Sequence, residues 1–202
     1  MKTKEFLKNE YVKTIIILIV IGASFAAFWF GPRFALKTGH PFLAVASGSM
    51  KPTLNIGDLI VVQGVSTASE IKAASKPEGD IIVYRVEGLI VGGQREGLIV
   101  HRAVDKKQVE GKWYFTTKGD HNSGEDSVRN ATTYKELPGV PESHIVGKVV
   151  YRIPWVGNIP LFIQTPSGMI LIVLLFVVWI FVEFLYSWKK KGEEEALKTE
   201  AL

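Results

Sequence analysis

Two serines two residues apart form the first group in this chain that could do chemistry. Ser47 and Ser49 flank Gly48 in the stretch SGSM, which follows the apolar segment FLAVA at 42–46. A serine hydroxyl attacks a carbonyl carbon when a base accepts its proton and nearby donors stabilise the oxyanion that forms. Ser-Gly-Ser also occurs in ordinary turns, so the pair alone indicates only a candidate nucleophile.

A histidine is the usual base for such a serine, and one histidine lies inside a predicted strand. His101 stands in LIVHRAV, where strand alternation puts its side chain on the face of Ile99 and Ala103. A histidine so placed is usually a structural residue, and that alternative stays open. Asp120 and Asp126 follow in the polar stretch KGDHNSGED, which is also compatible with a plain turn or a calcium loop, although it lacks the alternating acids of an EF-hand.

Two uncharged apolar runs enclose these residues. Residues 14–30 contain no Asp, Glu, Lys or Arg, and neither do residues 166–182, after which the apolar character continues to Trp188. At about 1.5 Å per residue, each run roughly matches the hydrocarbon core of a bilayer, so each predicts a membrane-spanning helix. A cleaved signal peptide is the alternative for the first run, but the run is long for that role and SFA at 24–26 is a poor cleavage site.

The positions of the basic residues predict the orientation. Lysines precede the first run and follow the second, at Lys2, Lys4, Lys8, Lys13 and Lys189–Lys191. Basic residues beside helix ends tend to stay in the cytoplasm, which predicts a multi-pass protein of the cell membrane with an extracytoplasmic central domain. The predicted order is cytoplasmic N-terminus, helix, β-rich domain, helix and cytoplasmic tail, at 1–13, 14–30, 31–165, 166–188 and 189–202.

The central segment predicts an all-β domain. Its apolar residues mostly alternate and are rich in β-branched types, and Gly92-Gly93 is a turn signal. Residues 66–79 are predicted to form a surface excursion, and the polar residues 119–143 a long loop. The predicted strands lie within 42–46, 58–65, 80–91, 97–104, 112–118 and 144–153.

Composition excludes several classes of function. The chain has 202 residues and no cysteine, which excludes a disulfide scaffold, thiol catalysis and cysteine-ligated zinc. A net charge of +4 without a basic cluster in the central domain gives little support to nucleic-acid binding. We expect no metal, no cofactor and no nucleic-acid partner.

Five motifs in this order resemble the type I signal peptidases. They are SGSMKPTL at 47–54, GDIIVYR at 79–85, VHR at 100–102, KGDHNSGED at 118–126 and IVGKVVYRIP at 145–154. The resemblance implies a membrane-bound serine endopeptidase that removes N-terminal signal peptides from secreted proteins by acyl-enzyme hydrolysis, cutting after small residues.

The residue at 101 indicates the branch of that family. Common bacterial members have a lysine base at this place, whereas the archaeal and endoplasmic-reticulum type has a histidine, as this chain does. This chain departs from that branch at His121, where asparagine often follows Gly-Asp, so His121 is a second candidate base. His40 and His144 are weaker candidates.

The resemblance implies a role for each site residue. Ser49 would be the nucleophile, His101 the general base, and Asp126 the acid that orients the imidazole, with Asp120 as the alternative or assisting acid. The hydroxyl of Ser47 and the backbone N–H of Ser49 would form the oxyanion hole.

The resemblance also implies how substrates bind. An extended preprotein would add as a strand beside FLAVA, with Val45 and Ala46 in contact with it. The expected partners are preproteins, the lipid bilayer and the secretion channel, and Trp155 could lie at the membrane interface or in the core. A non-enzymatic, membrane-anchored β-domain for adhesion or assembly is the alternative function. A soluble, self-cleaving peptidase of the repressor kind is a third, but that group uses a Ser–Lys pair.

Overall fold

The computed structural model describes residues 10–200, with side chains for residues 11–189. The chain divides into two compact units, the first ending at Gly157 and the second beginning at Asn158. Lys2, Lys4 and Lys8 of the predicted cytoplasmic N-terminus lie outside the described residues, as do residues 201–202 of the predicted tail.

The first unit begins with a long apolar helix, α2 (Glu10–Ala35). Its stretch Tyr11–Ala35 is long and apolar enough to cross a membrane, and none of its most apolar window is buried by protein. A helix that is apolar on all sides and uncovered by its own domain is typical of a membrane span. The helix extends beyond both ends of the apolar run at 14–30.

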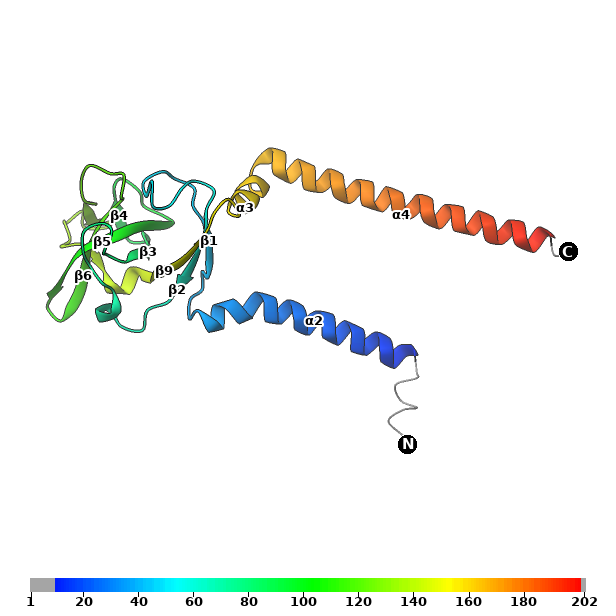
Figure 1. Cartoon of the computed structure of the whole chain (residues 1–202), viewed down its shortest axis with the longest axis horizontal. Coiled ribbons are helices and arrows are strands. Elements are labelled where there is room, and N and C mark those ends of the chain that lie inside the picture. The colour runs from blue at the N-terminus through cyan, green and yellow to red at the C-terminus, as the bar shows by residue number, and fades with distance from the viewer. Residues whose placement is uncertain (1–9, 201–202) are drawn as a thin grey trace, which may run out of the picture. The chain divides into compact units, whose positions relative to one another are not determined.

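A seven-stranded antiparallel sheet follows α2, with the strand order β1-β2-β9-β3-β5-β6-β8, and a separate two-stranded sheet pairs β4 with β7 (Figure 1). Short strand β1 forms one end of the large sheet. The strands are β1 (Phe42–Ala44), β2 (Leu59–Gln63), β3 (Ile81–Arg85), β4 (Leu89–Val91), β5 (Leu98–Val109), β6 (Lys112–Lys118), β7 (Val128–Asn130), β8 (Val140–Pro141) and β9 (Ile145–Ile153).

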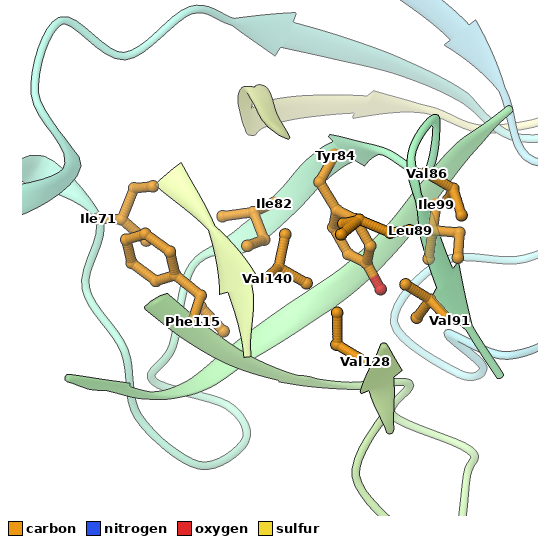
Figure 2. Close-up of a cluster of buried hydrophobic side chains, with 11 residues drawn as sticks. Ile71, Ile82, Tyr84, Val86, Leu89, Val91, Ile99, Phe115, Val128 and Val140 are labelled. Carbon is orange, nitrogen blue, oxygen red and sulfur yellow. The ribbon is translucent and has the colours of Figure 1, made fainter. Parts of the chain in front are cut away.

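Both faces of the large sheet are covered by apolar side chains. Ile82 and Tyr84 of β3 belong to one buried cluster, while Val83, between them, belongs to another. Since successive strand side chains point to opposite faces, the two clusters lie on opposite faces of the sheet. Figure 2 shows the first cluster, in which Phe115 and Ile71 also lie.

The structure corrects three details of the sequence prediction. The run 80–91 is two strands in different sheets, because it turns at Gly88, whose φ is +79°. Residues 119–143 are not one loop, since they contain the short strands β7 and β8 and part of a 3-10 turn, η2 (Glu142–His144). The excursion at 66–79 contains another 3-10 turn, η1 (Ala68–Glu70), and the fully buried Ile71, which attaches it to the core.

The second unit is helical. It comprises the short helix α3 (Asn158–Ile163) and the long helix α4 (Pro166–Glu200), whose part Pro166–Lys189 could cross a membrane by length and composition. The predicted fold class is therefore confirmed: a mainly β domain lies between one N-terminal and one C-terminal apolar helix.

Candidate active site

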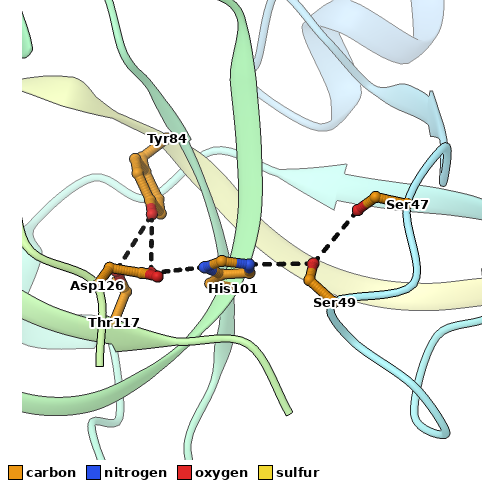
Figure 3. A network of polar contacts seen from close by, with 6 residues as sticks. All are labelled: Ser47, Ser49, Tyr84, His101, Thr117 and Asp126. Carbon is orange, nitrogen blue, oxygen red and sulfur yellow. Dashed lines mark hydrogen bonds and ion pairs between the residues drawn. The ribbon is translucent and has the colours of Figure 1, made fainter. Parts of the chain in front are cut away.

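The structure brings Ser49 and His101 into hydrogen-bonding distance. Ser49 Oγ lies 3.0 Å from His101 Nε2, although the two residues are 52 positions apart (Figure 3). His101 is carried by β5, where it lies opposite Ile82 of β3, and its neighbour Arg102 pairs with Lys118 of β6. Its side chain is about one-tenth exposed, on the face predicted from strand alternation.

The other ring nitrogen of His101 meets Asp126. Nδ1 lies 2.5 Å from Asp126 Oδ2, and the carboxylate is 8% exposed. An ionised carboxylate can only accept hydrogen bonds, so Nδ1 carries the proton and Nε2 is free to accept the proton of Ser49. This is the arrangement in which a histidine acts as a base toward a serine.

The turn that carries Ser49 is held from several directions. Met50 and Leu54 are buried, and the Leu54 N–H donates to the Met50 carbonyl at 3.0 Å. The N–H of His121 donates to the Ser49 carbonyl at 2.8 Å, and Arg152 of β9 donates to the carbonyl of Thr53 at 2.8 Å. These contacts use backbone and flanking groups, so the Ser49 hydroxyl stays available.

Gly119 allows the two loops of the site to approach each other. A Cβ atom at position 119 would lie 2.7 Å from the Ser49 carbonyl oxygen and 2.8 Å from the Asn122 side-chain nitrogen. Both distances are shorter than real Cβ contacts, so a larger residue would push the loop that carries Asp126 away from the Ser49 turn.

Asp120 does not contact His101. Its carboxylate binds Arg102 through Nε at 2.8 Å and Nη2 at 2.6 Å, and accepts a hydrogen bond from the hydroxyl of Thr53. Burial acts to raise the pKa of the Asp120 carboxyl, but the hydrogen bonds from Arg102 and Thr53 outweigh it and leave that pKa below its ordinary value. Asp120 therefore ties the Ser49 turn to β5 as an ionised structural partner.

Ser47 lies beside the candidate nucleophile. Its Oγ is 3.3 Å from Ser49 Oγ, and its side chain is exposed. A hydroxyl at this distance can turn toward an oxygen that develops next to Ser49, as an oxyanion-hole donor must.

A groove of about 450 Å³ opens over these residues. It is lined by the segment that contains the predicted contacts Val45 and Ala46, by the turn near Gly92, and by the start of β5 at Leu98. Its mixed polar and apolar lining could hold an extended peptide. Ser49, His101 and Asp126 all line the same groove.

The other histidines stand apart from this arrangement. His121 has an exposed side chain, and its backbone N–H donates to the Ser49 carbonyl. His40 and His144 line a different pocket, and His144 Nδ1 lies 3.0 Å from the carbonyl of Arg85. Within residues 11–189, no group of three or more His, Asp or Glu side chains is arranged to hold a metal ion.

Sequence reasoning missed several residues that support the site. Tyr84 and Thr117 contact Asp126, Thr53 binds Asp120, and Arg152 holds the Ser49 turn. Strand alternation was the signal that the sequence offered for these residues. It predicts that Thr117 and Thr116 face opposite sides of the sheet, but it does not predict that Thr117 contacts Asp126.

Comparison with known proteins finds relatives among signal peptidase subunits. No protein-family model matches the chain. The signal peptidase complex catalytic subunit SEC11 of Saccharomyces cerevisiae, in strains YJM789 and RM11-1a, is 29% identical over 159 residues, which are 78% of this chain and 86% of the relative. This similarity confirms the expected resemblance to signal peptidases of the type I, endoplasmic-reticulum and archaeal branch.

Proposed function

We propose that this chain is a membrane-bound serine endopeptidase that removes N-terminal signal peptides from secreted proteins. The observation that carries the proposal is the continuous contact from Ser49 through His101 to Asp126 inside a peptide-sized groove. The similarity to SEC11 over most of both chains supports the same function.

The proposed reaction has two halves. Ser49 Oγ attacks the carbonyl carbon of the scissile peptide bond, and its proton moves to His101 Nε2. The tetrahedral intermediate then collapses, the C–N bond breaks, and His101 returns the proton to the leaving amine. In the second half His101 takes a proton from water, the hydroxide attacks the acyl ester, and Ser49 is released with its proton restored.

The remaining site residues stabilise charge. In the proposal Asp126 holds the imidazole by its Nδ1–H and stabilises the imidazolium that forms in each half-reaction. The hydroxyl of Ser47 and the backbone N–H of Ser49 donate to the oxyanion of the tetrahedral intermediate. Asp120 keeps the Ser49 turn in register with β5 through Thr53 and Arg102.

The groove supports binding of an extended substrate. Strand β1 pairs only with β2 in the sheet order, and the following residues Val45 and Ala46 line the groove. A substrate strand could therefore pair along this segment, with its side chains alternately directed into the groove. We propose that shallow pockets there select small residues before the cut.

The two apolar helices support a membrane location. We propose that both cross the cell membrane, so that the chain is multi-pass with its β-domain on the extracytoplasmic side. A signal peptide is itself an apolar segment, so an enzyme held in the same bilayer meets it at a raised effective concentration. A position beside the secretion channel would suit substrates as they emerge.

The function is tested by incubating a preprotein with sealed membranes that contain the chain. We expect a product whose new N-terminus follows a small residue, and no such product from membranes without the chain. The alternative, a non-enzymatic domain for adhesion or assembly, predicts no cleavage, and the similarity to SEC11 does not favour it.

The orientation can be tested by cysteine labelling, because the chain contains no cysteine of its own. A single cysteine in the variant Ser75→Cys, in the exposed part of the 66–79 segment, should react with a membrane-impermeant maleimide added outside intact cells. The matched variant Lys2→Cys should react only after permeabilisation. Labelling of Lys2→Cys in intact cells would overturn the proposed orientation.

The oxyanion role of Ser47 predicts a large but incomplete loss. Ser47→Ala removes one donor, which we expect to lower kcat for preprotein cleavage by about 100-fold with little change in KM. Ser47→Thr keeps a hydroxyl at the same carbon and should retain most of the activity. Equal rates for Ser47→Ala and the wild type would exclude this role.

A further inference from the structure

One oxygen of Asp126 receives three hydrogen bonds from side chains. Besides the Nδ1–H of His101, Oδ2 accepts the hydroxyl of Thr117 at 2.7 Å and the hydroxyl of Tyr84 at 3.2 Å (Figure 3). The two hydroxyls also lie 3.2 Å from each other, so they form a small closed network on the carboxylate.

The register of the sheet explains why these side chains meet. Tyr84 of β3 is opposite Ile99 of β5, and Thr117 of β6 is opposite Ala103. His101 lies between Ile99 and Ala103 on β5, and residues two apart on a strand share a face. Three adjacent strands therefore direct Tyr84, His101 and Thr117 to the same face of the sheet.

Thr117 holds Asp126 at two points. The N–H of Asp126 donates to the Thr117 carbonyl at 2.8 Å, and the Thr117 hydroxyl donates to the Asp126 carboxylate. Together they close the loop between β6 and Asp126, so the direction of the carboxylate is fixed by the end of the strand.

Tyr84 keeps its proton under all working conditions. Its side chain is fully buried, and burial together with the nearby Asp126 charge raises the pKa of its hydroxyl above the ordinary value. A hydroxyl that stays protonated stays a donor. Neither Tyr84 nor Thr117 lines the groove, so neither is placed to contact a substrate.

We propose that Tyr84 and Thr117 are positioning residues, which hold Asp126 ionised and aimed at His101 Nδ1. The inference rests on the proposed function, because Asp126 needs a fixed direction and charge only if it orients His101 for the proposed reaction. Both positioning residues lie outside the groove. A buried carboxylate needs hydrogen-bond donors to remain charged, and these two hydroxyls supply them. Neither hydroxyl displaces the Nδ1–H of His101 from the carboxylate.

The other titratable and charged groups near the Asp126–His101 pair lie on three elements. On β3, Tyr84 contacts the carboxylate of Asp126. On the opposite face of β5, Arg102 is paired with Asp120. His121 belongs to the same loop as Asp126 but has an exposed side chain.

The test compares Tyr84→Phe and Thr117→Val with control variants that remove a hydroxyl from another tyrosine and another threonine, both on β6. Each variant keeps the shape of the side chain but removes one donor, so we expect kcat for preprotein cleavage to fall about tenfold with KM unchanged. With fewer donors on the Asp126 carboxylate, the Asp126–His101 pair should hold its proton more tightly. The acid limb of the kcat/KM profile should therefore move to higher pH, by about one unit in the double variant. Thr117→Ser should restore the wild-type profile, and Tyr114→Phe and Thr116→Val should leave it unchanged.

A spectroscopic measurement keeps this inference separate from the proposed function. The chain has four histidines, so ¹⁵N-histidine labelling of the full chain in detergent allows the titration of His101 to be followed without activity. We expect that titration to move to higher pH in both variants. If the wild type cleaves preproteins but Tyr84→Phe and Thr117→Val match Thr116→Val in rate, profile and titration, the positioning role is wrong. If the wild type does not cleave preproteins, but the His101 titration still moves to higher pH in Tyr84→Phe and Thr117→Val, the proposed function is wrong and the positioning role stands.

Discussion

Ser49→Ala is expected to abolish preprotein cleavage and to leave the β-domain folded. Without Oγ no acyl-enzyme can form, and loss of a serine nucleophile lowers kcat by a factor on the order of 10⁵ or more. The hydrogen bonds that hold the turn use the Ser49 carbonyl and the buried residues Met50 and Leu54, none of which the substitution removes. Cleavage of a radiolabelled preprotein by membranes with equal amounts of each variant measures the loss.

The matched control is Ser66→Ala, which removes an exposed hydroxyl that lines a different pocket. It should cleave at the wild-type rate, and all three proteins should show the same thermal unfolding midpoint in detergent. An active Ser49→Ala together with an inactive Ser47→Ala would reverse the assignment of the two serines.

The strands around the site were predictable because alternation is a local property. In LIVHRAV the pattern predicted that His101 shares a face with Ile99 and Ala103, and both of these are buried in the structure. The two apolar helices were predictable for a similar reason, since an uncharged run of this length has few other stable locations.

The pairing of short strands was not predictable. Val128–Asn130 lies in a polar stretch without a period, and it becomes strand β7 only because Leu89–Val91 offers a partner. The contact from Tyr84 to Asp126 spans 42 positions and depends on the register of three strands. In the sequence Tyr84 is simply one residue of an apolar run.

The choice between two acids also required tertiary structure. Asp120 and Asp126 stand in one polar stretch, and nothing in their spacing says which of them faces His101. Arg102, the residue after His101, points to the opposite face and pairs with Asp120 there. The backbone bond from Asp126 to Thr117 returns the loop to the face of His101.

His101→Ala is expected to lower kcat by about 10⁴-fold or more, because the proton of Ser49 then has no acceptor. The variant should still fold, since Tyr84 and Thr117 continue to donate to Asp126. Asp126→Ala should cost somewhat less, about 10³-fold, because the imidazole remains but loses its orientation and its counter-charge. Preprotein cleavage in detergent, measured from pH 5 to pH 9, compares these variants.

His121→Ala is the matched control, because it removes an imidazole from the same region but leaves the backbone bond to Ser49. Its rate should stay within a few-fold of the wild type. Added imidazole can enter the groove where the His101 ring was and accept the Ser49 proton, so it should partly restore His101→Ala but not Ser49→Ala. A nearly active His101→Ala would reject the proposed triad. An inactive His121→Ala that imidazole restores would also assign the base to His121.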